Sequence, residues 1–202
     1  DNHLLALLPR KDRTHLLAAC EPVDLTLSEV LCERGDVTQH VYFPTASFVS
    51  LVTRIDEHPG LEVGMVGSEG MLGVQVAMGV AKSPLQAVVQ GAGRSWRLEA
   101  AAFRDELARS PPLHRLLNRY LYVRMAQLAS SAGCLRYHLI GPRLARWLLM
   151  SQDRAHGNQF HVTHEFLAYM LGVRRVGVTM AAGELQRAGL ISYHRGELTV
   201  VD

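Results

Sequence analysis

The stretch that decides the fold lies near the C-terminus, where residues 163–189 read THEFLAYMLGVRRVGVTMAAGELQRAG. Thr163 is a residue type that caps helix N-termini, and a first helix is predicted to run from it to Leu171. Gly172 follows, and a second helix is predicted over residues 174–188. Two helices separated by so short a turn are typical of a helix-turn-helix unit.

A helix-turn-helix requires particular residue types because its two helices cross closely at a steep angle. The first helix needs a small residue at the crossing, here Ala168, and the turn needs a residue that tolerates positive φ, here Gly172. A β-branched residue, here Val178, then fills the space between the helices. The remaining inner positions are Leu167, Leu171, Val173 and Ala181. All requirements are met in one register, so we expect a helix-turn-helix here.

The outward face of the second predicted helix offers side chains suited to DNA. Arginine reaches guanine edges or phosphates, and threonine suits a phosphate or a thymine methyl group. Two strands, 190–193 and 198–201, are predicted to follow as a hairpin joined by residues 194–197, which makes the unit a winged helix. The candidate DNA-binding residues are Thr163, His164, Arg174, Arg175, Thr179, Met180 and Arg195.

Gly177 and Gly183 weaken the second helix by about 1 kcal/mol each relative to alanine. Either the backbone approaches another molecule closely there, or the glycines relieve crowding against neighbouring helices, and both interpretations stay open. A winged helix can also be a protein-interaction module. The two adjacent arginines favour DNA, as does the net charge of +2, which arises entirely from residues 139–202.

Upstream, the longest predicted helix runs from Leu113 to about Arg136 and has two apolar stripes. One stripe consists of Leu113, Leu116, Tyr120 and Val123; the other consists of Leu117, Leu121, Leu128 and Leu135. A helix buried on two sides needs two partners. We expect its own β-domain to cover the first stripe and a second subunit to cover the other. Burial of the whole helix in the core of a larger fold is the alternative.

The N-terminal half is rich in short β-type segments punctuated by turn signals. Many such strands suggest a compact antiparallel roll or barrel. The predicted strands are 23–27, 30–33, 40–43, 47–54, 61–66, 85–90 and 94–98, with turn signals at 35–36, Pro59-Gly60, 67–70 and 91–93. Helical segments are predicted at 4–8, 11–20 and 99–110 around them, and another begins at Gly141-Pro142.

Composition excludes several classes of protein. With 48% hydrophobic and 20% charged residues, the chain is not of a disordered type. It contains no run of about 18 apolar residues and no secretory signal pattern, so we expect no membrane partner. Its three cysteines, Cys20, Cys32 and Cys134, lack CxxC spacing, which fits a reducing cytoplasm.

The order of β-roll, long helix and winged helix resembles the Crp/Fnr family of bacterial regulators, over essentially the whole chain. The segments that show the resemblance are Val41–Pro44, Ser50–Val52, Glu62–Gly64, Gly67–Gly73, Leu171–Arg175, Ala188–Ile191 and Arg195–Gly196. The resemblance implies that the roll is a cyclic-nucleotide-binding-like sensor and that the long helix dimerises. It further implies that the second helix of the helix-turn-helix enters the major groove of double-stranded DNA, with RNA polymerase as a further candidate partner.

Departures from the family pattern concern the effector and the operator. Family members that bind nucleotides hold the ribose with a Gly-Glu pair and the phosphate with an Arg-Ser pair, whereas here Met71 follows Gly70 and residues 81–84 read AKSP. We therefore expect neither cAMP nor cGMP to be the ligand, and the effector stays unknown. The resemblance places a candidate effector pocket at Gly67, Glu69, Gly70, Met71, Lys82 and Ser83. Val176 and Met180 replace the family's usual Glu and second Arg, so the operator is expected to differ.

Catalytic and metal-binding patterns are not found. His156, His161 and His164 lie close in sequence without an HExxH or Cys/His frame, and no Gly-Lys-Ser/Thr follows the glycines at 67, 70 and 73. No Ser/His/Asp or Cys/His arrangement stands out either. We therefore expect a protein that is not an enzyme and holds no metal.

These observations predict an α+β fold in three parts. They are an antiparallel, double-stranded jelly-roll-like β-roll over residues 1–112, a dimerisation helix over 113–138 and a winged helix-turn-helix over 139–202. The expected function is that of a cytoplasmic homodimeric regulator that binds an inverted repeat in DNA. One alternative is the same regulator without any ligand, controlled by its abundance; another is a module whose winged helix binds protein.

Overall fold

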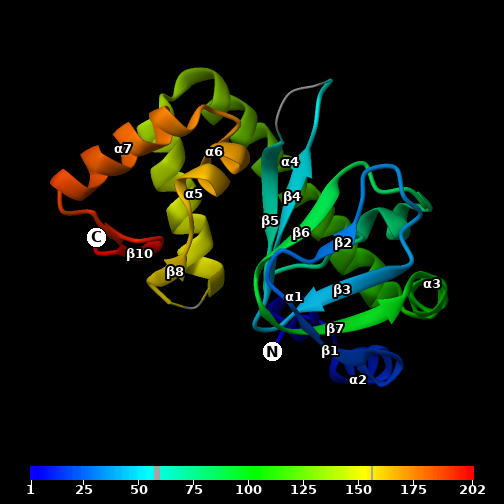
Figure 1. The fold of residues 1–202 in the computed structure, drawn as a ribbon. Helices are drawn as coiled ribbons and strands as arrows, with labels where there is room; N and C mark the ends of the chain where they lie inside the picture. Colours follow the sequence, from blue (N-terminus) through cyan, green and yellow to red (C-terminus); the bar gives the residue numbers. More distant parts are fainter. Residues whose placement is uncertain (57–59, 156) are drawn as a thin grey trace. The chain divides into compact units, whose positions relative to one another are not determined.

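The computed structural model of the chain describes residues 1–56, 60–155 and 157–202, so the predicted turn residue Pro59 and His156 lie outside the described residues. The chain forms two compact units. The first comprises residues 1–51 and 64–127, and the second comprises residues 52–63 and 128–202. Figure 1 shows the helices and strands of both units.

The described residues of the β-roll form seven strands, and each of them was predicted. They are β1 (Glu21–Leu25), β2 (Val30–Cys32), β3 (His40–Pro44), β4 (Phe48–Thr53), β5 (Leu61–Val66), β6 (Gln86–Gly91) and β7 (Gly93–Glu99). They form two sheets, with strand orders β1-β7-β3 and β2-β6-β4-β5. The pairs β1–β7, β3–β7 and β2–β6 are antiparallel, as expected for a roll. The α+β fold is therefore confirmed, while the short 3-10 helix η1 (Val74–Met78) was not predicted.

Three helices close the core of the N-terminal unit: α1 (His3–Ala6), α2 (Arg10–Ala19) and α3 (Ala100–Arg109). Phe43 from β3 and Phe103 from α3 are both fully buried, with their ring centroids 6.3 Å apart. Leu16 of α2 is buried in the same cluster. The predicted helical segments therefore pack their apolar side chains on the roll.

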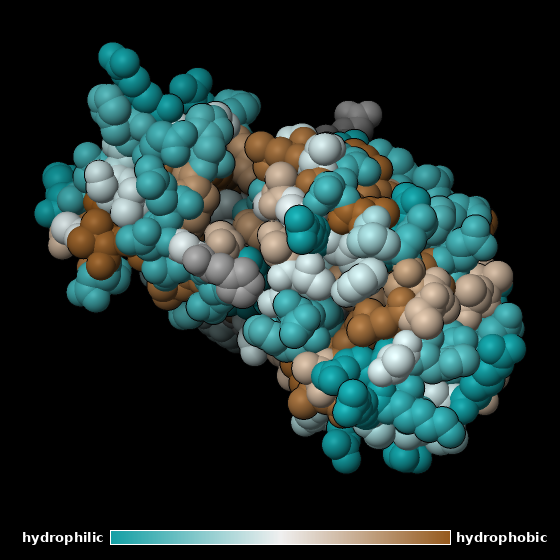
Figure 2. All heavy atoms as spheres, turned by 90° about the horizontal axis from the view of Figure 1, so that it is seen from below, coloured by the Kyte–Doolittle hydropathy of each residue, from teal (hydrophilic) through white to brown (hydrophobic). Residues whose placement is uncertain are grey.

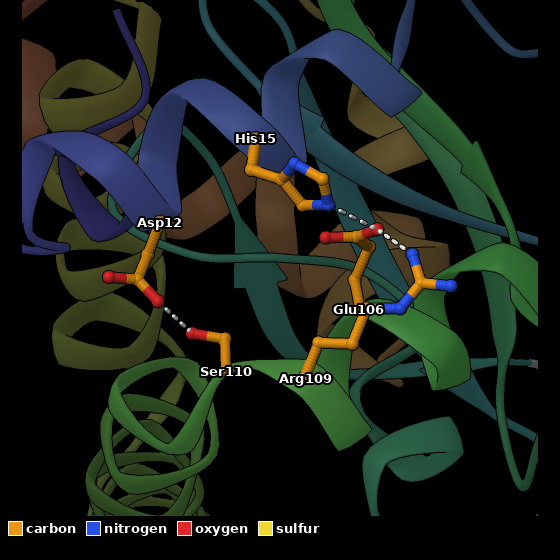
Figure 3. Close-up of polar contacts among 5 residues, drawn as sticks. All are labelled: Asp12, His15, Glu106, Arg109 and Ser110. Carbon is orange, nitrogen blue, oxygen red and sulfur yellow. Dashed lines mark hydrogen bonds and ion pairs between the residues drawn. The ribbon is translucent and has the colours of Figure 1, made fainter.

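A polar cluster joins α2 to α3 (Figure 3). The side chain of Glu106 is only 8% exposed, and its Oε1 lies 3.3 Å from His15 Nε2 and 3.5 Å from Arg109 Nη1. Ser110 donates a hydrogen bond of 2.6 Å to Asp12 Oδ1. A carboxylate so deeply buried is stabilised by partners of this kind.

The long helix α4 (Pro111–Tyr137) begins two residues before the predicted start at Leu113, and the hydroxyl of Ser110 caps it by accepting the backbone N–H of Leu113 at 3.2 Å. Leu113 and Leu117 are each 1% exposed and belong to the core of the N-terminal unit. The expectation that Leu117 lies at a dimer interface is therefore wrong, since its side chain has no surface left for a partner. Apolar spacing located the stripe but not which of its members face the core.

The other predicted interface residues of α4 stay accessible. Leu121 is half-buried, whereas Leu128 and Leu135 are 44% and 39% exposed. Met125 is 61% exposed and lies between the first two of these leucines in a spacing of four and three residues. This spacing continues the apolar stripe along one face of α4.

The C-terminal unit contains the predicted helix-turn-helix and wing. Its elements are α5 (Ile140–Ala155), β8 (Gln159–His161), α6 (His164–Leu171), α7 (Arg175–Arg187), β9 (Ile191–His194) and β10 (Glu197–Val200). The three strands form one antiparallel sheet in the order β8-β10-β9. Strand β8 was not predicted, because a strand of three residues leaves no alternating pattern to detect.

Candidate DNA interface

The turn between α6 and α7 has the geometry that its sequence predicted. The hydroxyl of Thr163 accepts the backbone N–H of Phe166 at 3.1 Å and caps α6. Gly172 adopts a left-handed conformation, with φ 62° and ψ 40°. Its N–H donates to Tyr169, and the N–H of Val173 donates to Ala168, a pair of bonds that closes the end of α6.

The inner faces of the two helices are closely packed. Ala168, where the helices cross, is 6% exposed, and Val178 of α7 is fully buried. Leu167 is also fully buried. Leu171 and Ala181 are buried as well, whereas Val173 is half-buried. The buried inner positions determine which side of α7 faces outward.

The outward side of α7 presents both charged and apolar groups. Arg174 is the N-cap residue in an extended conformation, and Arg175 is the first helical residue; both are exposed. Val176 and Met180 are 69% and 63% exposed despite being apolar. Exposed apolar side chains beside arginines at a helix start are suited to base edges and thymine methyl groups.

The two glycines of α7 have different surroundings. A Cβ atom added to Gly177 would lie 2.5 Å from Ile140 Cδ1 at the start of α5, so this glycine allows close packing of the two helices. A Cβ atom added to Gly183 would meet nothing within 4 Å. The crowding interpretation therefore holds for Gly177 and not for Gly183.

His164 is engaged inside the domain. The Thr179 hydroxyl donates to the carbonyl oxygen of Arg175 at 3.1 Å and lies 3.0 Å from His164 Nδ1. Because the single hydroxyl proton of Thr179 is used, His164 Nδ1–H is the donor between them. The His164 ring also stacks on Tyr193 of the wing, with centroids 4.6 Å apart and an interplanar angle of 14°.

The other ring nitrogen of His164, Nε2, is covered and has no hydrogen-bond partner among the described residues. Loss of solvent, and secondarily the positive charge of Arg175, lowers the pKa of His164 below its usual value. His164 and Thr179 therefore hold α6, α7 and the wing together. Tyr193 shares this role and donates from its hydroxyl to the Val162 carbonyl at 2.9 Å; sequence reasoning missed it, because stacking partners are distant in sequence.

The wing ends in a tight two-residue turn. Arg195 and Gly196 both have positive φ, 50° and 89°, which is the conformation of a type I′ hairpin. Arg195 is exposed at the tip of this turn, between β9 and β10. Directly after this turn, Glu197 Oε1 lies 2.7 Å from His161 Nδ1 of β8. The wing therefore presents an arginine on a well-ordered turn.

Arg174, Arg175 and Arg195 have no counter-charge among the described residues. Within the part of the chain that the structure describes, no carboxylate oxygen lies within 4.0 Å of the guanidinium groups of Arg174, Arg175 or Arg195. Such groups are available to an external anion, and DNA phosphates are the anions that helix-turn-helix domains meet.

The candidate effector residues fall into two segments of the N-terminal unit. In the first, Gly70 and Met71 are buried, and the Tyr120 hydroxyl bonds both the N–H and the carbonyl of Met71 at 3.2 and 3.1 Å. A Cβ atom added to Gly70 would lie 2.4 Å from the Tyr120 oxygen. Met71 therefore packs in the core, and its neighbour Glu69 is exposed.

The second segment contains Lys82 and Ser83. Lys82 is exposed and pairs with Val37 through an isolated β-bridge. Ser83 accepts the N–H of Gly35 through its carbonyl and donates from its own N–H to the Asp36 carbonyl. The two segments thus contact different parts of the unit, α4 for the first and residues 35–37 for the second.

Two further observations concern other kinds of site. Across residues 1–56, 60–155 and 157–202, no three His, Cys, Asp or Glu side chains are grouped so that they could hold a metal ion. None of the helices in those ranges is both long and apolar enough to cross a membrane.

Comparison with known proteins agrees with this geometry. Residues 142–202 match the model of the Crp-like helix-turn-helix domain. Over these residues the C-terminal unit is therefore similar to Crp-like helix-turn-helix domains. No curated protein sequence matches the chain.

Solved structures extend the likeness to the whole chain. The regulator CLP of Xanthomonas campestris, described as responsive to c-di-GMP, is 16% identical with a TM-score of 0.77, and the match covers 96% of this chain and 100% of that one. TTHA1359, a Crp/Fnr-family transcriptional regulator of Thermus thermophilus, is 22% identical with a TM-score of 0.73 and coverages of 90% and 94%. FixK2 of Bradyrhizobium japonicum is 12% identical with a TM-score of 0.75 and coverages of 91% and 93%. The chain therefore has the Crp/Fnr fold, as the sequence resemblance implied.

Proposed function

We propose that this protein is a transcription regulator that binds an inverted-repeat operator in double-stranded DNA as a homodimer. The observation that supports it best is the start of α7, where Arg174 and Arg175 are exposed and have no counter-charge among the described residues. In helix-turn-helix proteins the N-terminal residues of the second helix contact base edges. The similarity of residues 142–202 to Crp-like helix-turn-helix domains supports a DNA-binding role for this helix.

The individual residues are assigned different roles. Arg175 reads a base, while Arg174, Thr163 and the wing residue Arg195 contact phosphates. Met180 contacts a thymine methyl group. His164 and Thr179 act indirectly, since their polar atoms bond to one another and hold the helix in place.

The homodimer forms through the exposed apolar stripe of α4. Leu121, Met125, Leu128 and Leu135 follow the four-and-three spacing of helices that pair side by side. A symmetric dimer presents two recognition helices about one helical turn of DNA apart, so half-sites are expected about 10 bp apart or at a small multiple of that spacing.

The effector of this cytoplasmic regulator is neither cAMP nor cGMP. Met71 stands where nucleotide-binding members have their ribose-binding Glu, and its side chain is 1% exposed in the core. Lys82 cannot supply the bidentate contact of the family's arginine to a phosphate.

The test is selection of bound sequences from a randomised duplex library, followed by binding measurements at several salt concentrations. An inverted repeat with a steep salt dependence supports the proposal. Binding that is absent, or insensitive to salt and sequence, contradicts it and favours a protein partner for the winged helix. Calorimetry with cAMP and with cGMP should show no micromolar dissociation constant.

A further inference from the structure

A hollow lies in the N-terminal unit between α1, the residue Glu69 and α4. Its volume is about 510 Å³. Small-molecule sites typically occupy about 300–1,000 Å³, so the hollow has the size of such a site. Figure 2 views the molecule from the side on which α1 and α2 lie, and shows hydrophobic side chains gathered among hydrophilic ones there.

One part of the lining is apolar. Leu4 and Leu8 are each only 5% exposed, while Leu116 of α4 is half-buried. Leu7 and Val123 remain 72% and 49% exposed, although both are hydrophobic. An apolar ligand that covers them removes this surface from water.

Another part of the lining is positively charged. Arg115 and Arg119 lie one helical turn apart on α4, are exposed, and have neither a hydrogen bond nor an ion pair with any described residue. Like charges at this spacing repel each other, so a shared anion stabilises the pair. Arg124 is different, because it donates to the Met65 carbonyl and to Gln127 Oε1, each at 2.9 Å.

The chemistry of the two parts specifies one class of occupant. We propose that the hollow binds a linear acyl chain with a terminal carboxylate, with the carboxylate held by Arg115 and Arg119 and the chain lying against Leu7, Leu116 and Val123. Arginine is suited to this headgroup because its planar guanidinium binds a carboxylate through two hydrogen bonds.

A second copy of the chain does not compete for this site. At about 100° per residue, Arg119 and Val123 lie about 160° around α4 from Leu121, which belongs to the stripe assigned to the dimer. Dimerisation through Leu121 and Leu128 thus leaves the hollow open. Binding of the acyl carboxylate also does not depend on the proposed DNA-binding function, so it is tested without DNA.

The experiment is calorimetric titration of the full chain with dodecanoate, below the concentration at which dodecanoate forms micelles. We expect one site per chain with a micromolar dissociation constant. Arg115→Gln combined with Arg119→Gln should weaken binding at least tenfold, and Leu7→Gln should weaken it severalfold. Arg104→Gln, which changes an exposed arginine of α3, is the matched control and should bind like the wild type.

Two probes separate the headgroup from the chain. Acetate has the headgroup alone and dodecyltrimethylammonium has the chain with the opposite charge, and neither should bind at micromolar concentration. Equal binding of the cation, or unchanged binding of dodecanoate by the double arginine variant, overturns the proposal. Because Arg115 and Arg119 have no hydrogen bond or ion pair with a described residue, the arginine variants should melt near the wild-type temperature. Arg119→Lys, which keeps the charge without the bidentate contact, should bind with intermediate affinity.

Discussion

Two pairs of arginines in this molecule have similar charge but different neighbours. Arg174 and Arg175 are adjacent at the start of α7, on an exposed helix face beside Val176, which is 69% exposed. Arg115 and Arg119 lie one turn apart on α4, and both line a hollow of about 510 Å³. Neither pair has a carboxylate partner among the described residues.

The difference teaches that charge alone does not specify a ligand. At α7 the arginines stand on a helix whose outward side is accessible along its length, a surface that fits the groove of a duplex. On α4 the arginines border a space of small-molecule size with leucines in its lining, which excludes a duplex. The shape and polarity of the neighbours therefore separate a nucleic-acid site from a small-molecule site.

The largest expected effect comes from disrupting the dimer, which should weaken DNA binding and leave binding to the hollow unchanged. Leu121→Glu with Leu128→Glu places charges in the apolar stripe and should give a particle of monomer mass in sedimentation velocity. DNA affinity should fall about 10²–10⁴-fold, because two linked half-site contacts become one. Dodecanoate binding should be unchanged. Tyr122→Glu, at a 69% exposed position outside the stripe, is the control; a dimer that survives the double substitution would place the interface elsewhere.

The next effect concerns the DNA site alone. Arg175→Ala should cost about 1–3 kcal/mol on the selected operator and blur the preference at one base pair of each half-site. Arg174→Ala should instead weaken binding to all sequences alike and flatten the salt dependence by about one charge per subunit. Binding to a randomised half-site library measures both. If Arg175→Ala lowers the affinity for all sequences equally and leaves the base preferences intact, this residue contacts phosphate and does not read a base.

A smaller effect depends on pH and also distinguishes the sites. Since the pKa of His164 is lowered in the folded state, the unfolded chain binds a proton at this residue more readily than the folded chain does. The free energy of unfolding is therefore not reduced by His164 above about pH 6.5, the ordinary pKa of histidine. It decreases as the pH falls from there through the lower pKa that His164 has in the folded state.

Thermal melts of wild type and of His164→Phe measure this effect, because phenylalanine retains the ring but does not titrate. The variant should lose less stability on acidification, whereas His194→Gln, at an exposed histidine of the wing, should behave like the wild type. Among the described residues, no histidine lines the hollow beside Arg115 and Arg119, so dodecanoate affinity should stay level over the same pH range. Identical pH profiles for wild type and His164→Phe would show that His164 does not cause the loss of stability at low pH.

The smallest effect concerns the backbone of α7. Gly183→Ala should stabilise the protein by about 0.5–1 kcal/mol, because alanine is the better helix former and a Cβ atom there meets nothing within 4 Å. Gly177→Ala should gain less or destabilise, since its Cβ would lie 2.5 Å from Ile140 Cδ1. Chemical denaturation measures both, and equal gains at the two positions would contradict the packing difference.

The sequence by itself determined the features that depend on local chemistry. The cap at Thr163, the left-handed Gly172 and the buried Val178 all follow from residue type and spacing, because each contact spans only a few residues. The strands of the β-roll and the hairpin of the wing were equally predictable from alternation and turn residues. The exposed arginines at the start of α7 follow once the register of the inner face is known.

Only the tertiary structure decided which distant partner each side chain meets. The periodicity of α4 assigned Leu117 to a dimer interface, yet the side chain packs with Leu113 in the core. His164 was expected among the DNA-binding residues, and the structure shows its ring bonded to Thr179 and stacked on Tyr193, which lies 29 positions further along the chain. The hollow beside Arg119 is likewise created by α1 and α4, segments about a hundred residues apart. Such contacts are set by long-range packing, because many arrangements of apolar stripes bury similar area and only the assembled core selects one.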